Sequence, residues 1–145
     1  MWVIVATGII FSFQIFSAED IFSPTIVTPY LILPAILYWL YFFIGAMLVH
    51  RKAPSSVHSI DKIVKEGVYQ RLRHPIYSAD IVLAWGIFSH WPSMRALTAV
   101  IWLTIILSLW MRLEEKGLTE KFGMDYLEYK KQVPMVVPRK LKKKY

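Results

Sequence analysis

Four long stretches of this 145-residue chain contain no Asp, Glu, Lys or Arg, and this absence of charge constrains the fold most. The uncharged stretches are residues 1–18, 21–49, 81–94 and 96–111. An α-helix needs about 20 apolar residues to cross the hydrocarbon core of a bilayer. So small a domain with 56% hydrophobic residues cannot hide this much apolar surface in a soluble core. We therefore predict an all-α, polytopic membrane protein, a single domain over residues 1–145 with four transmembrane helices at about 2–17, 30–49, 76–91 and 94–111.

The basic residues predict how these spans are oriented. Sixteen of the 17 lie in two segments, residues 50–75 and 112–145, which four helices place on the same side of the membrane. Because Lys and Arg are retained in cytoplasmic loops, we expect both termini in the cytoplasm. The membrane would be the inner or plasma membrane of a prokaryote or the endoplasmic reticulum of a eukaryote. We expect the basic tail, residues 139–145, to bind lipid headgroups rather than nucleic acid. Four tryptophans lie near the predicted span ends, as interfacial anchors do: Trp2, Trp39, Trp91 and Trp110.

Several kinds of chemistry are excluded or unsupported by the residues present. The chain has no cysteine, which excludes disulfides, thiolate catalysis and zinc sites built on cysteine. The four histidines do not form an HExxH or other ligand cluster, so no metal site is predicted. The glycines form neither a phosphate loop nor a dinucleotide fingerprint, and no serine stands in a GxSxG motif.

A polar segment marks the start of the third predicted helix. Pro75 suits a first helical turn, which places Arg73 and His74 at an N-terminus whose unpaired N–H groups and dipole favour an anion. Tyr77 shares a face with His74. On the residues alone, a capping histidine and an interfacial tyrosine are an equally ordinary interpretation. Asp80, one turn further, is costly inside a bilayer and should face the bundle, toward Arg73 or a cation, unless its position is shallow and hydrated.

Two adjacent acids, Glu114 and Glu115, stand where the fourth span ends. Neighbouring helical side chains point about 100° apart, so one acid can face the bundle and the other water. Carboxylates are unfavourable at a helix C-terminus, so either the helix continues or the acids bind something positive. Arg112 lies three residues before Glu115 on one helical face, and we expect these two to be held together.

The tail over residues 112–145 predicts a C-terminal amphipathic cytoplasmic helix. Large apolar or aromatic residues recur there at roughly helical spacing, at Leu118, Phe122, Tyr126 and Tyr129. Such a helix lies on the membrane or folds over the polar segments, unless the stripe serves packing alone.

Read in order, the motifs are Gly67-x-Tyr69, Arg73-His74-Pro75-x-Tyr77, a membrane hairpin, Glu114-Glu115, Phe122-Gly123-x-x-Tyr126-x-x-Tyr129, Val133-Pro134 and Pro138. This series resembles the integral-membrane methyltransferases, which include isoprenylcysteine carboxyl methyltransferase and the phospholipid methyltransferases. The resemblance covers about residues 45–138. Two departures are Ala79, where the family often has glycine, and Asp80, which is unusual there.

The resemblance implies S-adenosylmethionine bound at the cytoplasmic ends of the last two spans. The implied cofactor-binding residues are Tyr69, Arg73, His74, Pro75, Tyr77, Glu114 and Glu115, and the expected catalytic pair is Glu115 with Arg112. The cofactor carboxylate suits an arginine, a histidine and a helix N-terminus, and its sulfonium and ammonium groups suit the glutamates. The methyl acceptor would be a lipophilic small molecule, a membrane lipid such as a phospholipid amine, or a prenylated protein.

Two other functions remain open on the sequence. Sterol reductases resemble the same C-terminal membrane core but use a nicotinamide cofactor, and they are much longer and lack support from the paired acids. A non-catalytic four-helix membrane protein would place polar residues at the middle of its spans. Here the polar residues gather at the predicted cytoplasmic ends.

Overall fold

The computed structural model describes residues 1–23, 25–50 and 62–138. Within these residues all regular secondary structure is helical, apart from one isolated bridge. The basic tail, residues 139–145, and residues 51–61 of the predicted 50–75 loop lie outside the described residues. The helices are α1 (Trp2–Ile15), η1 (Thr28–Leu31), α2 (Ile32–His50), η3 (Gly67–Gln70), α3 (Pro75–His90), α4 (Met94–Phe122) and α5 (Met124–Gln132).

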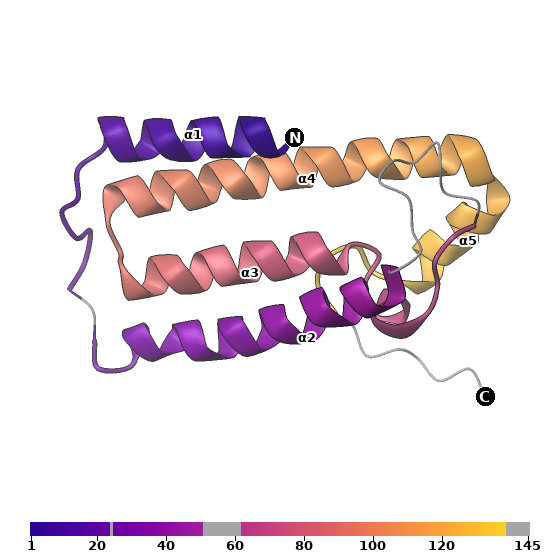
Figure 1. Cartoon of the computed structure of the whole chain (residues 1–145), viewed down its shortest axis with the longest axis horizontal. Coiled ribbons are helices and arrows are strands. Elements are labelled where there is room, and N and C mark those ends of the chain that lie inside the picture. Colours follow the sequence, from indigo (N-terminus) through magenta and orange to yellow (C-terminus); the bar gives the residue numbers. More distant parts are fainter. Residues whose placement is uncertain (24, 51–61, 139–145) are drawn as a thin grey trace.

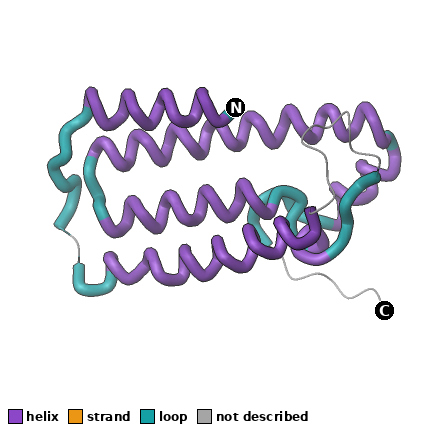
Figure 2. The backbone as a smooth tube through the Cα atoms, viewed as in Figure 1, coloured by secondary structure: helices purple, strands orange, loops and turns teal. Residues whose placement is uncertain are grey.

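The four long helices lie roughly side by side in the order α1, α4, α3, α2, which differs from their order in the chain (Figures 1 and 2). α3 packs mainly on α2, while α1 packs on α4. Glycines permit the closest contacts: a Cβ at Gly86 would come within 2.4 Å of Ala35, and one at Gly8 would overlap the Trp102 ring. α3 and α4 are joined by a tight hairpin at Pro92, as the sequence predicts.

Two helical segments, Thr28–Val49 and Met94–Phe122, are long and apolar enough to cross a membrane. α1 has 14 residues and α3 has 16, which correspond to lengths of about 21 and 24 Å. Both are shorter than the ~30 Å hydrocarbon core of a typical bilayer. The all-helical fold is therefore confirmed, whereas the count of four spans stays a prediction.

The fourth helix does not end with its apolar stretch. α4 continues to Phe122 as one helix of 29 residues, about 44 Å long, so both acids stand inside it. It ends at Gly123, whose φ of 54° is the left-handed conformation that glycine favours.

The predicted amphipathic stripe is consequently divided between the last turn of α4 and the short helix α5. The side chains of the stripe pack in one cluster with Val133 and Ile63. Tyr126, Tyr129 and Val133 are its buried members, and Ile63, Leu118 and Phe122 pack against them. The stripe therefore closes α5 against the end of α4. Contact of this helix with a membrane surface stays a prediction.

Candidate functional site at the N-terminus of α3

The N-terminus of α3 is covered by the chain's own C-terminal segment, residues 133–136. The backbone N–H groups of Arg73 and His74 donate to the carbonyls of Pro134 and Met135, at 3.0 and 3.2 Å. One turn later, Ser78 Oγ donates to the Val136 carbonyl at 2.7 Å. The C-terminal segment therefore lies against the helix N-terminus where the sequence predicts an anion, and it is bound there by the chain's own hydrogen bonds.

Arg73 points inward and joins three parts of the chain. Its Nε lies 2.6 Å from Glu115 Oε1, and its Nη1 donates to the carbonyls of Lys130, at 3.0 Å, and Val133. The other oxygen of Glu115 lies 2.9 Å from Lys130 Nζ. We call Arg73, Glu115 and Lys130 the ionic cluster. Because Glu115 is 8% exposed and both of its oxygens face cations, its charge serves to hold α3, α4 and α5 together.

Glu114 is surrounded differently from its neighbour. One of its oxygens, Oε1, accepts from Tyr77 Oη at 2.7 Å and from Trp110 Nε1 at 2.8 Å. The other, Oε2, lies 3.6 Å from His74 Nδ1, and the Glu114 side chain is 27% exposed. Neither Lys nor Arg among the described residues pairs with it. Glu114 thus keeps an uncompensated carboxylate at the edge of the cluster.

His74 is the buried polar side chain between the two acids. Its ring stacks on Tyr77 with centroids 5.8 Å apart, and its Nε2 lies 3.4 Å from Glu115 Oε1 without hydrogen-bond geometry. Within the described residues this buried nitrogen makes no hydrogen bond. An unsatisfied buried polar atom is costly, which makes Nε2 a place for a water or ligand atom.

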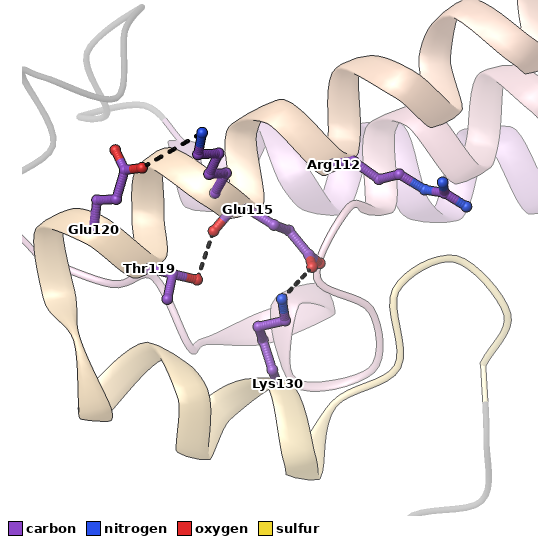
Figure 3. A pocket seen from close by; sticks show the side chains of 6 residues that line it. Arg112, Glu115, Thr119, Glu120 and Lys130 are labelled. Carbon is purple, nitrogen blue, oxygen red and sulfur yellow. Dashed lines mark hydrogen bonds and ion pairs between the residues drawn. The ribbon is translucent and has the colours of Figure 1, made fainter.

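A pocket of about 390 Å³ opens on the α5 side of the ionic cluster (Figure 3). It is lined by Arg112, Glu115, Lys116, Thr119, Glu120 and Lys130. Figure 3 shows Arg112 extending away from the Glu115 carboxylate, and no ion pair joins these two in the described part of the chain. The pocket therefore offers an exposed cation at its rim and a neutralised carboxylate deeper in.

Two other candidate residues lie beside this centre. Tyr69 is buried in η3, and its carbonyl accepts from Tyr129 Oη at 2.6 Å. Burial raises the pKa of Tyr129, so this hydroxyl stays protonated and able to donate. Asp80 faces α2, where Trp39 Nε1 donates to it at 2.9 Å. The expectation that Asp80 faces the bundle holds, but its partner is Trp39 and not Arg73.

The structure thus brings Arg73, His74 and Tyr77 together with both acids, across about 40 residues of sequence. Sequence reasoning missed Lys130, and it treated Trp110 only as a membrane anchor. The spacing of Trp110 and Glu114, four residues apart on one helix, is a signal that indicates their contact.

Comparisons with known proteins find relatives that are named as methyltransferases. Protein-S-isoprenylcysteine O-methyltransferase B of Arabidopsis thaliana is 32% identical over 80 residues, 53% of this chain and 40% of the relative. Methanethiol S-methyltransferase 1 of Bradyrhizobium diazoefficiens is 38% identical over 74 residues, 49% of this chain and 24% of the relative. Protein-S-isoprenylcysteine O-methyltransferase of Saccharomyces cerevisiae is 34% identical over 79 residues, 52% of this chain and 32% of the relative.

The matched part is less than half the length of each of these relatives. No solved structure matches the chain. The family model described as phospholipid methyltransferase, however, matches residues 2–125. Since this is most of the sequence, the chain belongs to the phospholipid methyltransferase family.

Proposed function

We propose that this protein transfers a methyl group from S-adenosylmethionine to a lipophilic acceptor held in the membrane. The proposal rests on the convergence of the Arg73-His74-Pro75-x-Tyr77 motif with Glu114 and Glu115. Of these residues, Glu115 lines the pocket. Membership of the family and the methyltransferase names of the relatives support the same reaction.

The residues present fit the cofactor in size and charge. A volume of about 390 Å³ falls within the range of small-molecule sites. S-adenosylmethionine carries a carboxylate, an ammonium and a sulfonium, and the site offers both signs of charge. The exposed Arg112, which lines the pocket, suits the carboxylate. Glu114 lies outside the pocket lining, next to Glu115 in α4, and suits a positive group or a ribose hydroxyl. The unpartnered His74 Nε2 is a further polar contact for a bound molecule.

The proposed roles of the candidate residues follow from their contacts. Arg73 and Glu115, with Pro75 and Tyr69 behind them, form the frame that fixes α5 and the C-terminal segment against α3. Glu114, His74 and Tyr77 are proposed to contact the cofactor. Arg112, which the sequence pairs with Glu115 as catalytic, is proposed to act on a bound anionic group instead.

Bound S-adenosylmethionine supplies a methyl group that its sulfonium already activates. The protein therefore needs to contribute little further chemistry. The side chains need to hold donor and acceptor in line and to keep water out. The C-terminal segment, closed over the N-terminus of α3, is placed to exclude water from that side.

For the membrane arrangement we propose four spans at about 2–17, 30–49, 76–91 and 94–111, with both termini cytoplasmic. In support, the polar cluster lies beyond the apolar part of α4, and many large apolar side chains of α1 and α2 are exposed. This arrangement lets the acceptor enter sideways from the bilayer, near α3 and α4.

The first experiment is a ligand-binding test on the detergent-solubilised protein. S-adenosylmethionine and S-adenosylhomocysteine should each raise the unfolding temperature, because ligand at 100 times its Kd stabilises the folded state by about 2.7 kcal/mol. A nicotinamide cofactor serves as the comparison. If it alone stabilises the protein, the reductase interpretation replaces this one.

The second experiment identifies the acceptor. Transfer of labelled methyl should be measured to prenylcysteine analogues, phospholipid amines and small thiols, each in a series of decreasing tail length. We expect activity to fall steeply as the tail shortens. Equal activity toward water-soluble analogues would contradict entry from the bilayer.

A further inference from the structure

We propose that Trp110 is a positioning residue that sets the orientation of Glu114, and through it the affinity for the cofactor. The inference rests on the proposed function, since it concerns how the acid proposed to contact the cofactor is held. Trp110 is not among the motifs on which the family resemblance rests.

The contact itself lies within one helix. Trp110 and Glu114 are four residues apart in α4, and the indole Nε1 donates to Glu114 Oε1 at 2.8 Å. The half-buried indole belongs to the same helix as the acid, so this contact restricts the Glu114 side-chain conformation without a contribution from another helix. Tyr77 of α3 then donates to the same oxygen at 2.7 Å.

This arrangement leaves the two carboxylate oxygens with different roles. Oε1 receives two neutral donors, while Oε2 is turned toward His74 at 3.6 Å. Neutral donors fix the geometry without cancelling the negative charge. Glu115 shows the contrast, because Arg73 and Lys130 neutralise its carboxylate at 2.6 and 2.9 Å. Glu114 is therefore held as an oriented charge, with Oε1 fixed by neutral donors and Oε2 directed toward His74.

Loss of the indole N–H should loosen this orientation. With the indole N–H removed and the Tyr77 hydroxyl retained, the carboxylate samples other conformations, and ordering it again reduces the free energy of ligand binding. Because the lost contact is a single hydrogen bond and the charge remains, we expect cofactor affinity to weaken about threefold to tenfold.

The test variant is Trp110→Phe, and α4 supplies a matched control. Trp102 is two turns earlier in the same helix, and its indole Nε1 donates at 3.1 Å to the Ile4 carbonyl of α1. Trp102→Phe therefore removes the same chemical group and one hydrogen bond, away from the polar cluster. Both variants should lose similar stability, so a difference in affinity between them reports on Glu114 and not on folding.

The measurement is calorimetric binding of S-adenosylhomocysteine to the solubilised full chain, with thermal unfolding followed in parallel. Trp110→Phe should raise the Kd about threefold to tenfold, whereas Trp102→Phe leaves it unchanged. In a Glu114→Ala background, Trp110→Phe should add no further loss, because its effect passes through the missing carboxylate. In turnover, KM for S-adenosylmethionine should rise while kcat at saturation stays near wild type.

Three results would overturn the positioning role of Trp110. They are wild-type affinity in Trp110→Phe, equal losses of affinity in both tryptophan variants, and a further loss of affinity in the Glu114→Ala background. If Trp110→Phe does not fold, Trp110→Met removes the same indole N–H with a flexible apolar side chain and must weaken binding instead. If wild-type protein binds neither S-adenosylhomocysteine nor S-adenosylmethionine, the proposed function itself fails, and that result is distinct from the others.

Discussion

The two ends of the helical layer use their polar groups in different ways. At the hairpin end, where α3 turns into α4, polar groups satisfy the chain's own backbone. The Ser93 hydroxyl accepts from the Ala96 N–H at 3.4 Å, and the Ile21 N–H donates to the Pro92 carbonyl at 2.7 Å. The charged Arg95 lies over the Phe13 ring, 5.2 Å from its centroid. These contacts close the turn and anchor the segment that follows α1.

At the opposite end, where α3 begins, side chains from α3, α4 and α5 meet each other. The members of the ionic cluster there neutralise one another, but the buried His74 Nε2 makes no hydrogen bond within the described residues. A high density of polar groups therefore does not by itself identify a binding site. The α3 end differs because it has a buried polar atom without a hydrogen bond, His74 Nε2, in a cluster that adjoins a pocket.

Replacing Glu115 should have the largest effect and should be an effect on stability. In Glu115→Ala, Arg73 and Lys130 lose their shared carboxylate, and breaking a buried ion pair by removing one partner costs about 3–5 kcal/mol. We expect the free energy of unfolding in detergent to fall by roughly that amount. Glu128→Ala, an exposed acid of α5, is the control and should stay within about 0.5 kcal/mol of wild type. A fully stable Glu115→Ala would show that the cluster does not hold this end together.

Replacing Glu114 should instead affect the cofactor. Glu114→Gln keeps an oxygen for Tyr77 and Trp110 but removes the charge, and a charge-assisted hydrogen bond contributes about 1.5–3 kcal/mol. We expect binding of S-adenosylmethionine to weaken about 10- to 150-fold, with stability close to wild type. Glu120→Gln is the control within the pocket, because its pairing with Lys116 is exposed at 3.9 Å and contributes little. If Glu114→Gln binds normally, the division of roles between the two acids is wrong.

Much of the fold was predictable because local chemistry decides it. Pro75 at the first turn and the uncharged stretches predicted the starts of α3 and α4 to within a residue or two. The meeting of the Arg73 segment with Glu114 and Glu115 followed from the family resemblance. The end of α4 was less clear, because a helix that leaves the apolar stretch continues until a residue such as Gly123 stops it.

The division of roles within the site was not predictable from spacing. Adjacent acids point about 100° apart, but which one meets Arg73 depends on how α4 rotates against α3. Likewise, the carbonyls that cap Arg73 and His74 come from residues 134–135, about 60 positions away. Asp80 meets Trp39 for the same reason, since the register between α2 and α3 is set by tertiary packing at Gly86.

Replacing Arg73 with lysine tests whether geometry or charge closes the α3 end. Arg73→Lys keeps a cation for Glu115 but cannot also reach the carbonyls of Lys130 and Val133. Loss of these bonds should lower stability by roughly 1–2 kcal/mol. The loss should be local, so amide exchange should increase over residues 124–136 and stay unchanged at the hairpin. An equal increase in amide exchange along the whole chain would contradict a stabilising role that is confined to α5 and the C-terminal segment.

The smallest expected effect is at the hairpin end. Ser93→Ala removes the side-chain cap of α4, and such a loss costs about 0.5–2 kcal/mol. Since the capping bond is long at 3.4 Å, we expect a value near 0.5 kcal/mol and no change in cofactor affinity. Ser93→Thr is the matched variant, because threonine also caps helices with a neutral hydroxyl suited to this buried position and should retain the stability. Thermal unfolding and calorimetric binding, measured on the same samples, separate the two properties. A loss of affinity in Ser93→Ala would mean that the α3 end depends on the hairpin, and the contrast between the two ends would no longer hold.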